Sequence, residues 1–233
     1  MPGATCIRGM GDGGPLKGGA PRVVWQTLGA DPRFVSATSA AQRLGELGRA
    51  CHLVWNPYQG GIAQLVPIVR AGRLLGRPEG LNATPPSWPA IEVTPGEVED
   101  ANAEGRLCVQ ICVVAFAWQP FTFWPLTGLQ QILDWLDAWG IPRRWPAGPP
   151  APFPDGLAIP GSHRLWSRGG YFGASQVPEL PAVGPGAIDI ERLTGRACGR
   201  AEGVPAPEAR TRDLDEYFDD DQAPVAGALS RVG

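Results

Sequence analysis

The side chains best suited to metal or acid–base chemistry are few in this chain of 233 residues. It contains two histidines and five cysteines, which are His52, His163, Cys6, Cys51, Cys108, Cys112 and Cys198. Thiolate and imidazole are preferred zinc ligands, so a site built from Cys51, His52 and Cys112 is one hypothesis. However, neighbouring residues of a strand point to opposite faces, and buried cysteines usually pack as small apolar side chains. The alternative is that His52 is a hydrogen-bonded core residue.

Serine chemistry is a further possibility. Ser162 precedes His163 directly, and Ser175 lies in a later loop. A serine nucleophile needs a histidine base that is itself oriented by an acid, and the chain has no acid-histidine-serine order that indicates such a triad. We therefore expect His163 to be an exposed loop residue.

Residues 51–67 must position His52, and their pattern predicts a β-hairpin. Runs of aliphatic and aromatic residues flank Asn-Pro-Tyr-Gln-Gly-Gly at 56–61. Proline fixes φ, glycine allows positive φ, and the Asn56 side chain can bond to its own turn. Two short antiparallel strands are the expected result.

The surrounding segments predict an α/β fold with a mixed central β-sheet flanked by helices. Residues 22–27 and the apolar run 106–116 are expected strands, the second of them central in the sheet because it is apolar on both faces. Ser36 or Thr38 can cap a helix that ends near residue 49. Residues 125–139 carry apolar side chains three or four positions apart, which predicts an amphipathic helix.

Composition divides the chain into three parts. The Gly-rich residues 1–20 are expected to be a disordered leader, 21–192 a single domain, and 193–233 an acidic, disordered tail. The net charge of −3 arises from about −5 in residues 208–221 and +2 elsewhere, which indicates no nucleic-acid partner. Because the most apolar window contains Gln and Pro, no membrane span is expected.

The N-terminus lacks the apolar run of a signal peptide, so we expect synthesis in the cytoplasm, with any cell-wall or virion association requiring separate delivery. Nineteen of the twenty basic residues are Arg, which together with abundant Ala, Gly and Pro is typical of a GC-rich genome. An actinobacterium or one of its phages is the source that this composition indicates.

The hairpin pattern His-Leu-Val-x-Asn-Pro-x-x-Gly-x-Ile-x-Gln-Leu-Val-Pro resembles the central hairpin of N-acetylmuramoyl-L-alanine amidases and peptidoglycan-recognition proteins. The likeness extends over residues 22–190 and is greatest to the endolysin-like, phage-type amidases of actinobacteria. Besides the hairpin, the motifs that carry it, in the same order, are 23–27, 110–113, 139–142, 173–178 and 184–188.

The resemblance implies zinc-assisted cleavage of the amide between the lactyl group and L-alanine in peptidoglycan. It also implies which positions would hold the metal. Two histidines and a carboxylate or thiolate are expected where this chain has Gln26, Ala174 and Gly184. Supporting positions are changed too, because Cys112 replaces a Glu of the phage-type relatives and Cys51 replaces a Tyr found in others. His52 matches the hairpin histidine, which the resemblance does not make a ligand.

The sequence therefore favours a pseudoenzyme without zinc or another cofactor. It would bind peptidoglycan or muropeptide, or it would be a structural part of a phage or phage-derived particle and contact the other proteins of that particle. A working zinc amidase with a rebuilt metal site is the alternative, and a pure assembly role is a third hypothesis. Aromatic rings can stack on sugars, so the candidate binding groove consists of His52, Trp55, Tyr58, Trp166 and Tyr171. These rings could equally fill the core.

Overall fold

The predicted hairpin is present. In this computed structural model, which describes residues 1–9, 11–75, 101–157, 161–180, 182 and 184–195, strands β3 (Leu53–Trp55) and β4 (Ile62–Gln64) pair antiparallel. Residues 56–61 connect them. All three residues of β3 are buried, so the hairpin forms part of the core.

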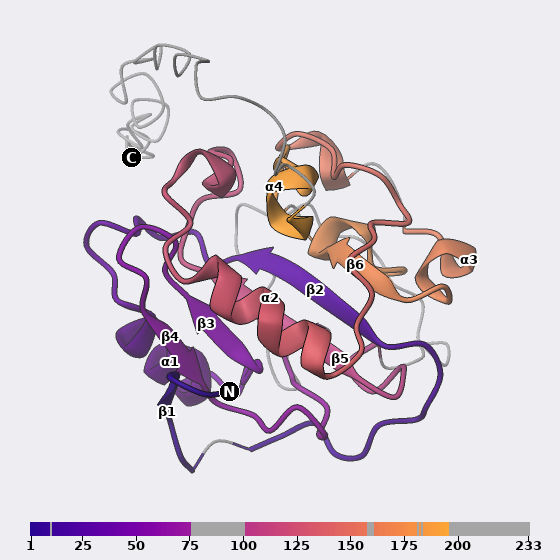
Figure 1. Cartoon of the computed structure of the whole chain (residues 1–233), viewed down its shortest axis with the longest axis horizontal. Helices are drawn as coiled ribbons and strands as arrows, with labels where there is room; N and C mark the ends of the chain where they lie inside the picture. Colours follow the sequence, from indigo (N-terminus) through magenta and orange to yellow (C-terminus); the bar gives the residue numbers. More distant parts are fainter. Residues whose placement is uncertain (10, 76–100, 158–160, 181, 183, 196–233) are drawn as a thin grey trace, which may run out of the picture. The chain divides into compact units, whose positions relative to one another are not determined.

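The hairpin belongs to a six-stranded mixed sheet in the order β1-β4-β3-β5-β2-β6 (Figure 1). Strand β5 (Cys108–Val113) lies between β3 and β2 (Arg22–Thr27), parallel to both, and β6 (Gly170–Gly173) pairs parallel with β2. All six residues of β5 are buried. The prediction of an α/β fold with a central, buried strand in this region is confirmed.

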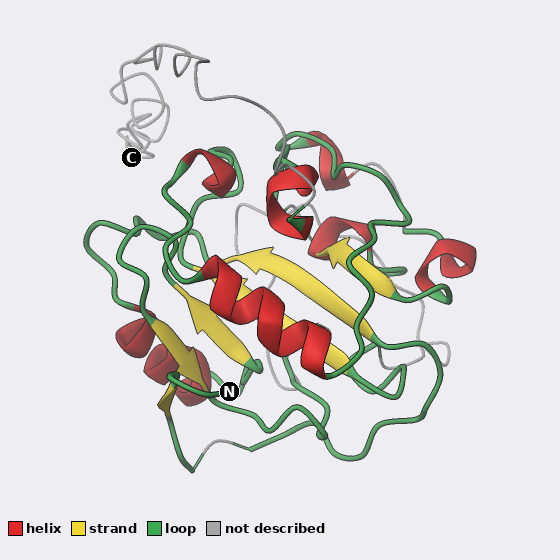
Figure 2. Ribbon diagram, viewed as in Figure 1, coloured by secondary structure: helices red, strands yellow, loops and turns green. Residues whose placement is uncertain are grey.

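Helix α2 (Leu129–Ala138) covers one face of the sheet (Figure 2). Alternate residues of the strands face it, because successive side chains of a strand point to opposite sides. Trp25 and Ile111 are among these residues, and they share one apolar cluster with Ile132 and Leu136 of the helix. Burial of this cluster is the main stabilising contribution on that face.

Helix α1 (Ala37–Glu46) packs on the opposite face. Ser36 caps it as predicted, because its hydroxyl accepts a hydrogen bond from the Ser39 amide. Small side chains, Ala40 and Ala41 among them, bring the helix close to Val54 of β3. The sheet is therefore covered on both faces, as its apolar central strands require.

The helix expected over 125–139 begins four residues later than predicted. Leu126 and Gly128 have positive φ values of 58° and 86°, which a right-handed helix cannot include. Apolar spacing records which residues face the core but not the backbone angles between them. The predicted end is confirmed, because Gly140 has a φ of 68° and stops the helix.

The expectation of a disordered leader is wrong for the described part of residues 1–20. Strand β1 (Thr5–Cys6) pairs parallel with β4, and the Ile7 amide donates to the Gln64 carbonyl at 2.9 Å. Asp12 forms an ion pair with Arg70 at 2.9 Å. Backbone pairing needs no particular side chains, so a two-residue strand among glycines gives no periodic signal.

Short elements complete the described chain. Helix α4 (Ile190–Thr194) continues two residues past the predicted domain boundary at 192. Residues 196–233, which include most of the predicted acidic tail, lie outside the described residues. In the part of the chain that is described, no helix has the length and apolarity that a membrane crossing needs. The short elements are η1 (Phe121–Phe123), η2 (Asp155–Leu157), α3 (His163–Trp166), η3 (Ala174–Gln176) and α4 (Ile190–Thr194).

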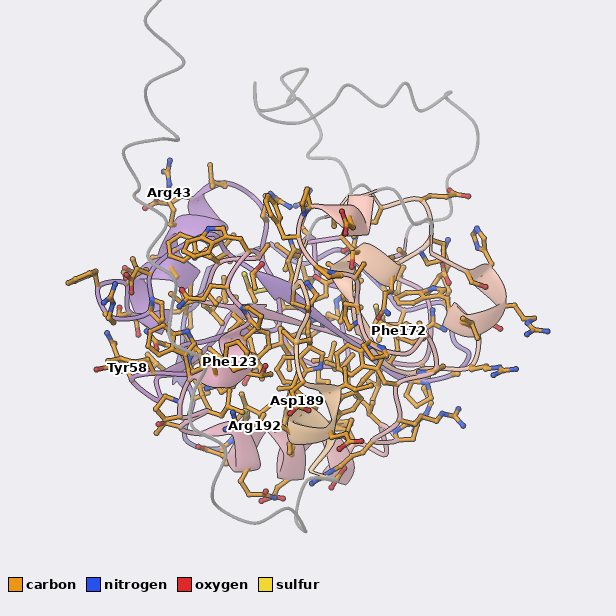
Figure 3. All side chains as sticks on the ribbon, turned by 90° about the horizontal axis from the view of Figure 1, so that it is seen from above. Arg43, Tyr58, Phe123, Phe172, Asp189 and Arg192 are labelled. Atoms are coloured by element: carbon orange, nitrogen blue, oxygen red, sulfur yellow. The ribbon has the colours of Figure 1, made fainter. Side chains whose placement is uncertain are left out.

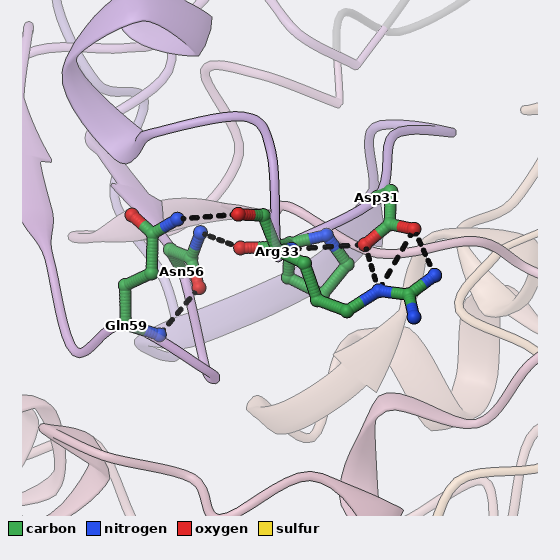
Figure 4. A network of polar contacts seen from close by, with 5 residues as sticks. Asp31, Arg33, Asn56 and Gln59 are labelled. Atoms are coloured by element: carbon green, nitrogen blue, oxygen red, sulfur yellow. Dashed lines mark hydrogen bonds and ion pairs between the residues drawn. The ribbon is translucent and has the colours of Figure 1, made fainter.

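Asn56 joins the hairpin turn to the loop that follows β2 (Figure 4). Its side chain is fully buried, and its amide nitrogen donates to the carbonyls of Pro32 and Val35 at 2.7 and 2.8 Å. Its side-chain oxygen accepts from the amides of Tyr58 and Gln59, which confirms the predicted turn role. One side chain thus fixes two loops at the same end of the sheet.

Substitution of Asn56 should test this junction. We expect Asn56→Ala to lower the free energy of unfolding by about 2–4 kcal/mol, because it leaves buried backbone groups without partners. Urea denaturation measures the change. Gln59→Ala is the matched control, since that side chain is exposed and donates once, to the Arg33 carbonyl. Equal losses in the two variants would contradict the role given to Asn56.

Candidate functional site

His52 lies in the core with both ring nitrogens hydrogen-bonded. The backbone amide of Gln110 donates to Nδ1 at 3.1 Å, so Nδ1 is the acceptor and the proton lies on Nε2, which faces the Arg70 carbonyl at 2.9 Å. The side chain is completely buried. The interpretation of His52 as a hydrogen-bonded core histidine is therefore confirmed, and neither ring nitrogen is free to bind a metal or substrate.

A buried polar network continues from His52 into the central strand. The side-chain oxygen of Gln110 accepts from the Leu74 amide at 3.1 Å, and its nitrogen donates to Asn102 at 2.7 Å. Asn102 in turn accepts from the Leu75 amide at 2.9 Å. The network therefore connects β5 to the segment that follows the hairpin.

Burial lowers the pKa of His52 to about 4, with the Arg70 carbonyl opposing the shift. Protonation of Nδ1 would also destroy the bond from Gln110. The unfolded chain takes up a proton near pH 6.5, whereas the folded chain does so only near pH 4, so acid favours unfolding between these values. The stabilising contribution of neutral His52 is complete above pH 6.5 and is lost as the pH falls.

Acidification from pH 7 to pH 5 should therefore lower the free energy of unfolding by about 2 kcal/mol. Urea denaturation at the two pH values measures the loss. We expect His52→Gln to be less stable at pH 7 and to lose much less stability over this interval. His163→Gln, which removes the exposed second histidine, is the matched control. An unchanged pH dependence in His52→Gln would refute the assignment.

Cys51 and Cys112 do not form a metal site with His52. Both thiols are fully buried, and burial raises the pKa of Cys112 to about 12 and that of Cys51 well above its usual value. The Cys51 thiol donates to the Leu53 carbonyl at 3.3 Å. Among the residues whose positions are described, no three His, Cys, Asp or Glu side chains gather closely enough to hold a metal ion. The Cys51/His52/Cys112 zinc hypothesis is wrong.

The three positions that the resemblance associates with zinc lie beside one another. Trp25 pairs with Gly173 across β2 and β6, so the next residues on the two segments are Gln26 and Ala174. The Ser175 amide donates to the Gly184 carbonyl at 2.8 Å, which brings the third position to the same place. Gln26 also pairs with Cys112 across β2 and β5.

These positions do not fit a zinc ion. Zinc in proteins takes thiolate, imidazole or carboxylate ligands, whereas Gln26 offers an amide, Ala174 a methyl group and Gly184 a hydrogen. The side-chain oxygen of Gln26 and the hydroxyl of Ser175 are buried with no hydrogen-bond partner among the described residues. Such groups usually have partners, so this end of β2 and β6 can accept hydrogen bonds from a ligand or donate them to one.

Close packing at Gly184 offers a test of this arrangement. A Cβ atom added to Gly184 would lie 2.6 Å from the Thr27 hydroxyl, so Gly184→Ala should cost about 1–3 kcal/mol of stability. In a Thr27→Ala background the same change should cost clearly less. A double-mutant cycle measured by denaturation gives the coupling. Additive losses would show that the two residues are not in contact.

Four of the five predicted groove residues are buried, so the prediction that they line a groove is wrong for them. His52, Trp55, Trp166 and Tyr171 are all at most 2% exposed. Each has a structural role: for example, the Trp55 indole donates to the Thr127 carbonyl at 2.9 Å, and the Arg22 guanidinium lies 4.3 Å above the Trp166 ring. Tyr58 is the exception, with 45% of its surface exposed.

Tyr58 belongs to a set of exposed and half-buried aromatic side chains at the carboxyl ends of the parallel strands. We call this set of side chains the aromatic edge. Its members come from the loop after β2, the β3–β4 turn and the segment after β5. Figure 3 labels two members, Tyr58 and Phe123. Phe34, Trp118 and Phe123 are 81%, 58% and 68% exposed. The full set is Phe34, Tyr58, Phe116, Trp118, Phe123 and Trp124.

Two pairs of rings organise the aromatic edge. Phe116 stacks on Trp118 with 4.9 Å between ring centres, and Tyr58 meets Trp124 edge-on at 5.3 Å. The carboxyl ends of strands are where α/β sheets commonly bind ligands. Sequence reasoning found Tyr58 but missed the other five members, although one signal was available: every member except Phe116 lies in a connection after a predicted strand.

His163 and the serines are not arranged for nucleophilic catalysis. His163 is exposed, as predicted, and its Nε2 lies 3.3 Å from a Glu179 oxygen. Within the described ranges, no hydrogen bond joins its ring to Ser162 or Ser175. A serine nucleophile activated by this histidine therefore finds no support.

Comparison with known proteins returns no relative. No protein-family model, no curated protein and no solved structure matches the chain.

Proposed function

We propose that this protein binds the glycopeptide of peptidoglycan without hydrolysing it, as a catalytically inactive relative of N-acetylmuramoyl-L-alanine amidases. The observation that carries the proposal is the set of side chains at three adjoining positions, Gln26, Ala174 and Gly184. An amidase of this type needs zinc ligands there, and this chain offers one amide, one methyl group and no third side chain.

The surroundings of these positions support binding. Gln26 and Ser175 each keep a buried polar atom without a partner among the described residues, and such atoms can bond to hydroxyl or amide groups of a glycopeptide. The aromatic edge lies at the carboxyl ends of β2, β3 and β5, of which β2 carries Gln26, and it exposes flat apolar rings. Sugar rings present apolar faces that stack on such surfaces, so ring stacking and a few hydrogen bonds provide the affinity.

The proposed binding activity also indicates where the protein acts. A protein that binds peptidoglycan without cleaving it acts at the cell wall, or on a phage particle that must attach to the wall. The phage-type character of the resembling motifs favours these two settings, in which the partner is peptidoglycan or a muropeptide.

Cosedimentation with insoluble peptidoglycan tests binding. We expect the wild-type protein in the pellet, no release of muropeptides, and no change in either result after chelator treatment or zinc addition. Muropeptide release that stops with chelator and returns with zinc would establish the alternative, an amidase with a rebuilt metal site. Protein that stays in the supernatant would contradict binding and favour an assembly role.

Substitution in the aromatic edge should weaken binding. We expect Tyr58→Ala and Trp118→Ala each to reduce peptidoglycan affinity by about threefold to tenfold, because each removes one stacking ring worth about 0.5–1.5 kcal/mol. Binding isotherms from the cosedimentation assay measure this change. Trp139→Ala is the matched control, since Trp139 is a partly exposed ring at the end of α2. An equal reduction in the control would contradict a specific role for the aromatic edge.

A further inference from the structure

A pocket of about 260 Å³ lies beside η3, the short helix that directly follows β6. Its walls come from four segments: the loop after α2, η2, residues 161–165 at the start of α3, and η3 itself. The lining residues important to its chemistry are Ala147, Pro149, Ser162, Leu165, Ser175 and Gln176. Ser175 connects the pocket to the site described above, because it follows Ala174 directly and its amide bonds to the Gly184 carbonyl.

The described lining of the pocket is uncharged and combines apolar walls with hydroxyl groups. Ala147, Pro149 and Leu165 contribute methyl and methylene groups. Ser175 contributes a buried hydroxyl that has no hydrogen-bond partner among the described residues. Ser162 precedes α3 but forms no side-chain capping bond with it. A charged ligand would lose its hydration here without gaining an opposite charge, so a neutral polar ligand is favoured.

Gln176 holds one wall of the pocket in place. Its side-chain oxygen accepts from the Trp145 indole at 2.7 Å and from the Gly173 amide at 3.0 Å. Its side-chain nitrogen donates to the Gly148 carbonyl at 2.8 Å. These three bonds tie the loop after α2 to η3, so the pocket is formed before any ligand arrives, which lowers the entropic cost of binding.

We propose that this pocket binds an uncharged amide group that carries a methyl, such as the acetamido group of an N-acetylated sugar. The inference rests on the proposed function and specifies the part of the glycopeptide that is recognised. A serine hydroxyl can donate to the amide oxygen or accept from the amide N–H, and the apolar walls fit the methyl group. The volume corresponds to roughly nine water molecules, which exceeds the needs of one acetamido group and leaves room for part of the sugar ring.

Binding of two disaccharides to the full chain tests the proposal. N,N′-Diacetylchitobiose carries two acetamido groups, and cellobiose has hydroxyls in their place. Calorimetric or NMR titration should show at least tenfold tighter binding of diacetylchitobiose. Equal binding of the two disaccharides, or no binding of either, would overturn the proposal.

Variants then locate the binding to this pocket. Ala147→Leu should reduce diacetylchitobiose binding at least tenfold, because the larger side chain fills the space. Ala138→Leu, which adds the same volume at an exposed position of α2, should leave binding unchanged. Ser175→Ala should fold normally, since it removes a buried hydroxyl that has no partner among the described residues, and should weaken binding about threefold to tenfold. Unchanged binding in both Ala147→Leu and Ser175→Ala would overturn the assignment.

Peptidoglycan cosedimentation of the same proteins separates the two proposals. If wild-type protein pellets with peptidoglycan but does not bind diacetylchitobiose, the pocket assignment fails and the proposed function stands. If it binds diacetylchitobiose through the pocket but does not pellet, the proposed function fails and the pocket assignment stands.

Discussion

The complete burial of strand β5 is the constraint on which the rest of the structure depends. A strand that is covered on both faces cannot bond to water, so each of its polar groups must find a partner inside the protein. Gln110 shows the consequence. Its backbone carbonyl accepts from the His52 amide, its backbone amide donates to the His52 ring, and its side chain bonds to Leu74 and Asn102. One polar residue in an apolar strand therefore fixes the hairpin and two neighbouring segments.

This constraint explains why His52 suggests chemistry in the sequence but has a structural role in the folded chain. An imidazole that accepts from one backbone group and donates to another has no remaining capacity for a metal or a substrate. Its low pKa keeps it neutral at physiological pH, and of the two neutral tautomers only the one protonated on Nε2 satisfies both partners. The role of His52 is therefore structural.

Much of the scaffold could be predicted from the sequence. Strands β2 and β5 and the hairpin were predictable because apolar runs and turn residues record burial and chain reversal directly. The start of α2 was not, since the left-handed angles at Leu126 and Gly128 have no periodic signature. Strand β1 was not predictable either, because it pairs through its backbone alone.

The candidate site was predictable in part. The resemblance brought Gln26, Ala174 and Gly184 together, and the described contacts place them side by side. The aromatic residues were assigned wrongly because a tryptophan gives the same signal in a core and on a rim. Trp55 faces α2 by strand alternation and is buried, whereas Trp118 lies beyond the end of β5 and is exposed. The pocket beside η3 is formed by loop and short-helix segments between residues 147 and 176, and such segments carry no periodic pattern that could indicate it.

Strand β1 also has a consequence for how the protein behaves in solution. It occupies the outer edge of β4, where an unpaired strand would present a row of free backbone donors and acceptors to other molecules. Two residues are enough to cover most of this short edge, because β4 itself has only three. Pairing of the glycine-rich N-terminal segment with β4 thus protects this edge from pairing with other molecules. An extension fused to the N-terminus must leave Thr5 and Cys6 free to pair with β4.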